Sequence, residues 1–373
     1  DLPLPLTDLL VAAKATHPGG HLDKMRVEVT RFGLRAGDSH ASGSLKVATP
    51  LSEPDLALTV DAVLDLAEIA KAYPVPDAEG LAGQLSAKVD LAAKGEQIKR
   101  LKGDISVANL LYREKDAPAV RVDEARVLLS PNATTLETFK AKLGRSDVAL
   151  TGSLSPLMAF LSDEQQISGD LQLRSQALYV DDFLSNDEDV QAAEESTPFL
   201  LPDNVDAKLS VDVAKLTYGD LVLKDFAGTA RVRDRKLWLN NVKADTLGGS
   251  MKLSGTVATP VGEPARFEVT YEVDQVSFAE ASKALPALRA YAPVTSFLQG
   301  RFSTDLKASG ELGEDGAPKL SSIDAGGLLM TMQSKLDADF KPLAMLSKAV
   351  PAIPTPLNLG SFETRFDIKD GAV

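Results

Sequence analysis

Few residues in this sequence have the types and spacing that catalysis or metal binding would need. The chain has three histidines, and Pro18-Gly19-Gly20 separates His17 from His21. This break prevents the helical i,i+4 pairing that many metal sites use. We interpret both histidines as loop residues in a surface turn. His40 has no carboxylate or thiol partner at a fixed spacing, so the histidines predict neither a metal centre nor a general base.

Two other short motifs resemble binding loops but lack the required spacing. Leu247-Gly248-Gly249-Ser250 has no Walker lysine and no GxGxxG pattern, and a strand pattern follows it, so we interpret Gly248-Gly249 as a tight hairpin turn. Asp187-Glu188-Asp189 lacks the central glycine of a calcium loop and lies in an acidic stretch, Ser185–Thr197, that we interpret as a solvated loop. No paired acid and base suggests a hydrolase. The sequence therefore predicts no catalytic residue, no metal and no cofactor, and we expect a protein that is not an enzyme.

The composition of the chain indicates which classes of partner the protein can bind. The 373 residues carry a net charge of −13 and include no cysteine, so clustered cations for phosphate binding, disulfides and thiolate metal sites are all missing. We therefore expect no nucleic-acid partner. No apolar run reaches the ~20 residues that span a bilayer. Because the sequence starts at Asp1 and not at Met, we expect a fragment that lacks an N-terminal membrane anchor.

Alternation of apolar and polar residues is the dominant pattern. Leu85, Ala87, Val89 and Leu91 share one face of a predicted strand, and the polar residues between them share the other. The same period of two recurs along the whole chain. Such one-sided strands are typical of antiparallel meanders, whereas buried parallel strands read as continuous apolar runs.

A repeat organises these strands. The segments HASGSLKVATP, VALTGSLSP and SMKLSGTVATP align on Gly43, Gly152 and Gly255, which lie 109 and 103 residues apart. A near-constant period indicates a repeated supersecondary unit. We therefore predict one continuous β-groove array over residues 1–373, with repeat units at about 1–50, 51–156, 157–260 and 261–373.

Short helices are predicted where capping signals occur. Asp65–Tyr73 and Ser277–Leu285 each begin with a capping residue followed three positions later by Glu, and we expect both to cap the groove with an apolar face. The middle repeat lacks this helix. Further short helices are predicted at Thr7–Thr16, Pro156–Leu161 and Pro342–Val350. The proline-rich segment 351–358 is predicted to be a connector.

The block from Lys236 to Pro260, with the following FEVTYEVDQVSFAEASKALP and LQGRFSTDLKASGE, resembles the C-terminal region of the AsmA family of Gram-negative envelope proteins. GRSDVALTGSLSP, from Gly144 to Pro156, is similar to a related block in AsmA and TamB proteins. The resemblance implies a mainly β fold: an elongated, curved, taco-like antiparallel sheet groove with a few short amphipathic helices. The Gly-Gly block expected after LGSFETRFDIKDGAV is missing, so we also expect a C-terminal continuation.

The resemblance also implies a function. It implies a periplasmic protein, anchored to the inner membrane when full-length, that carries phospholipid or another acyl-chain lipid between the inner and outer membranes, with an outer-membrane protein as a further partner. Apolar residues of the alternating strands are the candidate groove lining. They are Leu58, Val60, Leu85, Val89, Leu91, Leu171, Leu173, Leu209, Val211, Val213, Leu253, Phe267, Val269, Tyr271, Phe302 and Leu306.

The residues alone lead to two alternatives. A long sheet with one apolar face must cover that face with another layer, with helices or with a ligand, and the predicted helices are too short for the task. An acyl chain gains ~0.8 kcal/mol for each buried methylene, so an apolar trough is sufficient to bind it. The alternative is a structural scaffold for outer-membrane assembly whose interior is packed with its own side chains. A continuous trough or a packed interior would distinguish the two.

Overall fold

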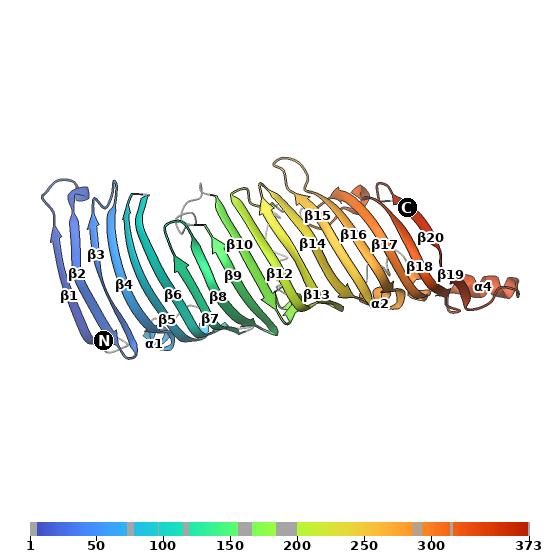
Figure 1. Cartoon of the computed structure of the whole chain (residues 1–373), viewed down its shortest axis with the longest axis horizontal. Helices are drawn as coiled ribbons and strands as arrows, with labels where there is room; N and C mark the ends of the chain where they lie inside the picture. Colours follow the sequence, from blue (N-terminus) through green and yellow to red (C-terminus); the bar gives the residue numbers. More distant parts are fainter. Residues whose placement is uncertain are drawn as a thin grey trace. The chain divides into compact units, whose positions relative to one another are not determined.

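The computed structural model forms two compact units, Asp1–Arg174 (unit 1) and Ser175–Val373 (unit 2). The fold is mainly β, as the sequence predicts, and each unit is an open antiparallel sheet with few short helices (Figure 1). The described residues are 6–72, 78–95, 97–114, 119–155, 166–183, 200–285, 289, 293–313 and 316–371.

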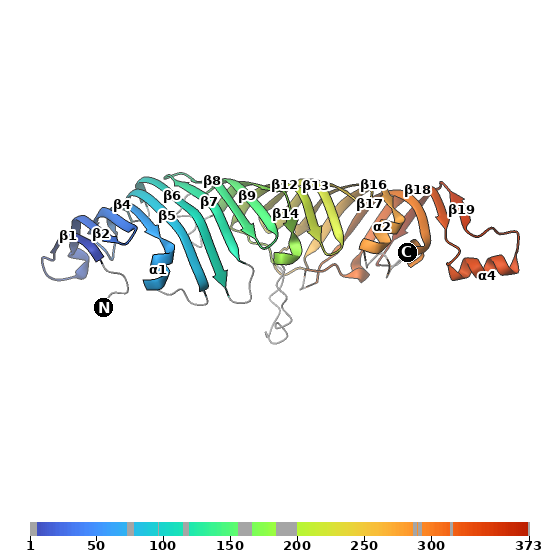
Figure 2. The same cartoon turned by 90° about the horizontal axis from the view of Figure 1, so that it is seen from below.

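Unit 1 is a meander in which each strand pairs antiparallel with the next one in sequence. Helix α1 (Leu66–Ala72) follows the fourth strand. The strands bend along their length (Figure 2). They are β1 (Leu6–Thr16), β2 (Arg26–Ala36), β3 (Ser39–Ala48), β4 (Asp55–Asp65), β5 (Ala78–Lys94), β6 (Gln97–Glu114), β7 (Val120–Leu129), β8 (Thr134–Leu143), β9 (Ser146–Leu154) and β10 (Ile167–Ser175).

Unit 2 repeats this plan from β12 to β18, again with antiparallel neighbours. A two-residue strand, β11, pairs parallel with β12, and both β19 and β20 pair with β18. The strands are β11 (Leu178–Tyr179), β12 (Val205–Tyr218), β13 (Leu221–Arg233), β14 (Lys236–Thr246), β15 (Gly249–Ala258), β16 (Arg266–Ser277), β17 (Leu298–Glu311), β18 (Asp324–Leu336), β19 (Leu357–Gly360) and β20 (Glu363–Ile368).

Short helical segments interrupt the meanders. The α-helices whose bounds lie within the described residues of unit 2 are α2 (Phe278–Ala284) and α4 (Lys341–Ala349). The 3-10 segments are η1 (Leu22–Lys24), η3 (Val180–Phe183), η5 (Pro293–Phe297) and η6 (Leu320–Ser322).

Hairpin turns follow from local backbone preference. Between β14 and β15 the two turn residues are Leu247 and Gly248, with φ of 51° and 76°. Two consecutive residues with positive φ match the right-handed twist of the flanking strands. The predicted Gly248-Gly249 turn is therefore displaced by one residue. Gly249 begins β15, where a Cβ would lie 2.2 Å from the carbonyl oxygen of Asp274.

The predicted helices at Asp65–Tyr73, Ser277–Leu285 and Pro342–Val350 are confirmed as α1, α2 and α4, except that Tyr73 lies outside the described residues. The predicted helix at Thr7–Thr16 is wrong. This segment is strand β1, which pairs along its length with β2. Backbone pairing with a free strand edge outweighs the high helix propensity of its leucines and alanines.

Three further predictions can be placed. The connector over 351–358 is turn and bend up to residue 356, and its last two residues begin β19. In the middle repeat, β10 and β11 are followed by η3 and not by an α-helix. The predicted helix at Pro156–Leu161 and the acidic loop Ser185–Thr197 lie outside the described residues.

Candidate functional site

The apolar residues of unit 1 form continuous rows across neighbouring strands. Gly43 of β3 pairs with Val60 of β4, and Val60 pairs in turn with Val89 of β5. Because side chains alternate between the faces of a strand, paired residues of one row lie on the same face. We call this surface the apolar face of unit 1. Two further rows belong to the same face. The first row consists of Leu45, Leu58, Leu91 and Leu101. The second row consists of Ala62, Ala87, Ile105, Val127, Leu136, Gly152 and Leu171.

Unit 2 has an apolar face built in the same way. Leu253 of β15 pairs with Tyr271 of β16, which pairs with Leu306 of β17. Burial raises the pKa of the Tyr271 hydroxyl, because desolvation disfavours the charged phenolate. The neighbouring row crosses more of the sheet: Leu209, Ala230, Leu239, Gly255, Val269, Ala308, Ala325 and Ile368.

All sixteen candidate lining residues belong to these two faces. In unit 1 the register places Leu58, Val60, Leu85, Val89, Leu91, Leu171 and Leu173 on one face. In unit 2 the strand register likewise places nine candidates on one face: Leu209, Val211, Val213, Leu253, Phe267, Val269, Tyr271, Phe302 and Leu306.

Most of the candidates keep part of their surface exposed. Fifteen of the sixteen are half-buried, and the exception is Val213, whose exposed fraction is 0%. Val213 is therefore packed interior and is corrected from a lining residue to a core residue. Among the described residues, strands pack extensively only against their hydrogen-bonded neighbours. No second sheet covers either apolar face within that part of the chain.

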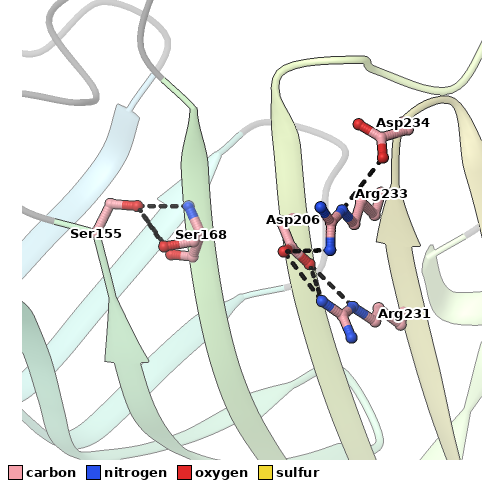
Figure 3. A network of polar contacts seen from close by, with 6 residues as sticks. All are labelled: Ser155, Ser168, Asp206, Arg231, Arg233 and Asp234. Atoms are coloured by element: carbon pink, nitrogen blue, oxygen red, sulfur yellow. Dashed lines mark hydrogen bonds and ion pairs between the residues drawn. The ribbon is translucent and has the colours of Figure 1, made fainter.

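The opposite face of each sheet carries charged pairs between strands. In unit 1, Arg126 binds Asp104 through two hydrogen bonds of 3.0 and 2.7 Å, and these hold the pKa of Asp104 below its usual value. In unit 2, Asp206 accepts from Arg231 and lies near Arg233 (Figure 3). We call these surfaces the ion-paired faces. Their partners are mostly exposed, so each pair contributes little stability and mainly keeps the face hydrated.

Helix α2 lies over one end of the apolar face of unit 2. Its first residue, Phe278, is 4% exposed and its ring contacts Phe302 of β17. Ala281 packs with Val273 and Val276 in the small core of this unit. Ser277 caps the start of the helix, and its hydroxyl accepts from the backbone N–H of Glu280 at 3.4 Å. The prediction that α2 turns its apolar side toward the sheet is therefore confirmed.

Helix α1 is held to unit 1 by its capping glutamate. Asp65 Oδ1 accepts from the Glu68 backbone N–H at 3.0 Å. The Glu68 carboxylate in turn accepts from the Asp38 backbone N–H at 3.1 Å and from the Ser39 hydroxyl. Both partners belong to the hairpin between β2 and β3, so α1 lies at the end of the strands that this turn connects (Figure 1).

The three repeat glycines occupy the same local setting. Gly43, Gly152 and Gly255 pair with Phe32, Leu136 and Leu239, and a register shift follows or precedes that pair in each case. A Cβ on any of them would lie 2.0–2.5 Å from a carbonyl oxygen of the next strand. Glycine is therefore required for close approach of the strands, and this local equivalence agrees with the repeat alignment.

Two of the three histidines make local hydrogen bonds in one turn. His17 Nε2 lies 3.3 Å from the His21 carbonyl oxygen, and His21 Nδ1 accepts from the Asp23 backbone N–H, so both histidines serve a local turn as predicted. No group of three metal-ligating side chains occurs among the described residues. Asp187-Glu188-Asp189 lies outside them.

Sequence reasoning missed one hollow in unit 2. It has a volume of about 740 Å³ and is lined mainly by residues of the ion-paired face, including Trp238, Glu268 and Lys307. Its lining comes from β14 to β18 and β20 and their flanks, so no local sequence signal could have revealed it. It is open and mixed in polarity, and we assign it no chemistry.

No family model matches this chain, and neither the curated proteins nor the solved structures include a significant match. Within the described ranges, no helix combines the length and apolar character needed to cross a bilayer.

Proposed function

We propose that this protein binds acyl-chain lipid on the apolar faces of its sheets and takes part in phospholipid transport between the inner and outer membranes. In this proposal it works in the periplasm, and the full-length protein is anchored to the inner membrane and meets an outer-membrane protein. The compartment, the two membranes and these partners rest on the AsmA resemblance of Lys236–Pro260.

One observation carries the lipid-binding part of the proposal. Rows of apolar side chains run across successive strands of each unit, and most of these side chains stay half-buried, without a second sheet over them in the described part of the chain. A surface of this kind gains free energy when apolar ligand atoms replace water. An acyl chain gains ~0.8 kcal/mol per buried methylene and needs no directional partner.

The experiment that tests the proposal is native mass spectrometry of the protein purified from its host envelope, with wild type compared to Val269→Asp and Val211→Asp. Both valines lie on the apolar face and are half-buried. An unpaired carboxylate there would be strongly disfavoured beside an acyl chain. We expect bound phospholipid in the wild type and loss of most of it in each variant.

Thr270→Asp is the matched control, because Thr270 adjoins Val269 on the same strand but is exposed on the opposite face. Circular dichroism then separates the alternatives. Folded valine variants without lipid support a lipid-binding face. If the valine variants unfold while Thr270→Asp does not, the valines are packed core and the scaffold function is favoured. Valine variants that fold and keep normal lipid overturn the proposal.

A further inference from the structure

Helix α4 presents an apolar surface that the other described residues of unit 2 leave exposed. Met345 is 72% exposed and Leu346 is 50% exposed, and Val350 directly after the helix is 44% exposed. At 100° per residue, Met345 and Ala349 fall on the side of the helix away from Leu343, which is only 3% exposed, and Leu346 lies between Ala349 and Leu343. The helix therefore keeps an apolar surface in water that adjoins its buried residue.

The helix is fixed in place at both of its ends. Before it, the ring of Phe340 packs on Phe297 with centroids 5.5 Å apart, and the Asp337 backbone N–H donates to the Phe297 carbonyl oxygen. After it, β19 returns to the sheet, where Leu357 pairs with Leu336. Figure 2 shows α4 projecting beyond β18, with the chain returning from it to β19.

The charge of this segment differs from that of the chain. Residues 340–362 contain Lys341 and Lys348 and no Asp or Glu, whereas the whole chain has 53 acidic and 40 basic residues. Both lysines are exposed, and on the helical wheel they lie beside Met345. The only positive surface of this helix thus borders its apolar side.

An apolar side flanked by lysines is suited to the boundary between head groups and acyl chains of an anionic bilayer. We propose that α4 docks unit 2 onto a lipid bilayer with anionic head groups, with Met345 and Leu346 inserted among the acyl chains and Lys341 and Lys348 against the head groups. This docking goes beyond the proposed function and does not require lipid on the apolar faces. A protein partner would cover the apolar side equally well, but the two lysines beside Met345 favour anionic lipid head groups.

Vesicle flotation tests the docking surface. The full chain is mixed with vesicles of phosphatidylethanolamine and phosphatidylglycerol, with phosphatidylcholine vesicles as the neutral comparison. The test variant is Met345→Glu with Leu346→Glu. The control is Val261→Glu with Leu320→Glu, which adds the same charge at two other exposed apolar residues of unit 2. We expect the control to bind like wild type and the test variant to bind at least roughly tenfold more weakly.

The lysines give a second readout. Replacing Lys341 and Lys348 by Gln should abolish the preference for vesicles that contain phosphatidylglycerol and the weakening of binding by salt. Met345→Gln with Leu346→Gln repeats the test without added charge and should also weaken binding.

Three results would overturn the proposal: no binding of wild type to anionic vesicles, equal binding by the test and control variants, or a concentration-dependent dimer in sedimentation that the test variant abolishes. The last result would mean that a second copy covers α4. Native mass spectrometry of bound lipid is a separate measurement. Failure of lipid binding on the apolar faces is therefore distinguishable from failure of docking through α4.

Discussion

The rings of Phe278 and Phe302 lie 4.6 Å apart between centroids, with their planes inclined by 33°. Phe278 begins α2, and Phe302 belongs to the apolar face on β17. This pair joins the helix to the sheet that it caps. In unit 2, a small packed cluster therefore lies under α2, while the candidate lining residues Leu253, Val269 and Leu306 farther along the strands stay half-buried.

Phe278→Ala should destabilise unit 2 by about 3–5 kcal/mol, because it removes a buried ring and leaves a cavity against Phe302. Urea unfolding followed by circular dichroism measures this free energy. Phe362→Ala is the control, since Phe362 is 43% exposed and its loss should cost less than about 1 kcal/mol. Equal losses in the two variants would mean that α2 does not stabilise the sheet through this contact.

Gly43→Ala should destabilise unit 1 by about 1–3 kcal/mol, because the new Cβ has no room. It would lie 2.0 Å from the Thr59 carbonyl oxygen and 2.9 Å from the Phe32 ring. Gly33→Ala is the matched control on the paired strand, where the nearest atom is Leu10 Cβ at 3.9 Å. The melting temperature should fall for the first variant and stay nearly constant for the second. A well-tolerated Gly43→Ala would contradict the close approach of the strands.

Asp65→Ala should weaken the start of α1 by about 1 kcal/mol, because the Glu68 backbone N–H loses its acceptor. Hydrogen exchange of the α1 amides is the measurement, and these amides should exchange faster in the variant. Asp65→Asn keeps a side-chain oxygen at the same place and should preserve most of the protection. If both variants exchange alike, the cap does not control this helix.

Asp104 should titrate below the ordinary aspartate pKa of about 3.9. The hydrogen bonds from Arg126, followed by its charge, lower this pKa. Because the folded-state pKa lies below the unfolded one, the contribution to stability is present above about pH 4 and is lost as the pH falls through the folded value. Arg126→Gln should move the pKa of Asp104 back up toward its ordinary value.

Carboxyl NMR titration measures this shift, and Asp23 provides an internal control. The pKa of Asp23 is lowered by hydrogen bonds from the Ser52 hydroxyl and from the backbone N–H groups of Ser52 and Leu51. It should therefore stay low in Arg126→Gln. A variant in which both carboxyl groups shift would point to a general change in structure.

Several features of this protein were predictable because they depend on neighbours in sequence. The period of two in residues 85–91 places alternate side chains on opposite faces of any strand, so the apolar face of β5 could be derived without a partner strand. Ser277 with Glu280 predicted α2, because a capping bond closes within one turn. The repeat alignment of Gly43, Gly152 and Gly255 was also accessible, since steric need for glycine recurs with the repeat.

Other features depended on which segments meet in space. Thr7–Thr16 has a composition that suits a helix, yet it becomes β1 because β2 offers a free edge. Val213 alternates like its neighbours on β12, but the tertiary structure buries it completely. The sequence predicted the helix at Pro342–Val350 but not that Met345 and Leu346 would stay in water. Alternation and capping are local and can be read from the chain, whereas burial depends on which distant residues surround a side chain, and this only the tertiary structure decides.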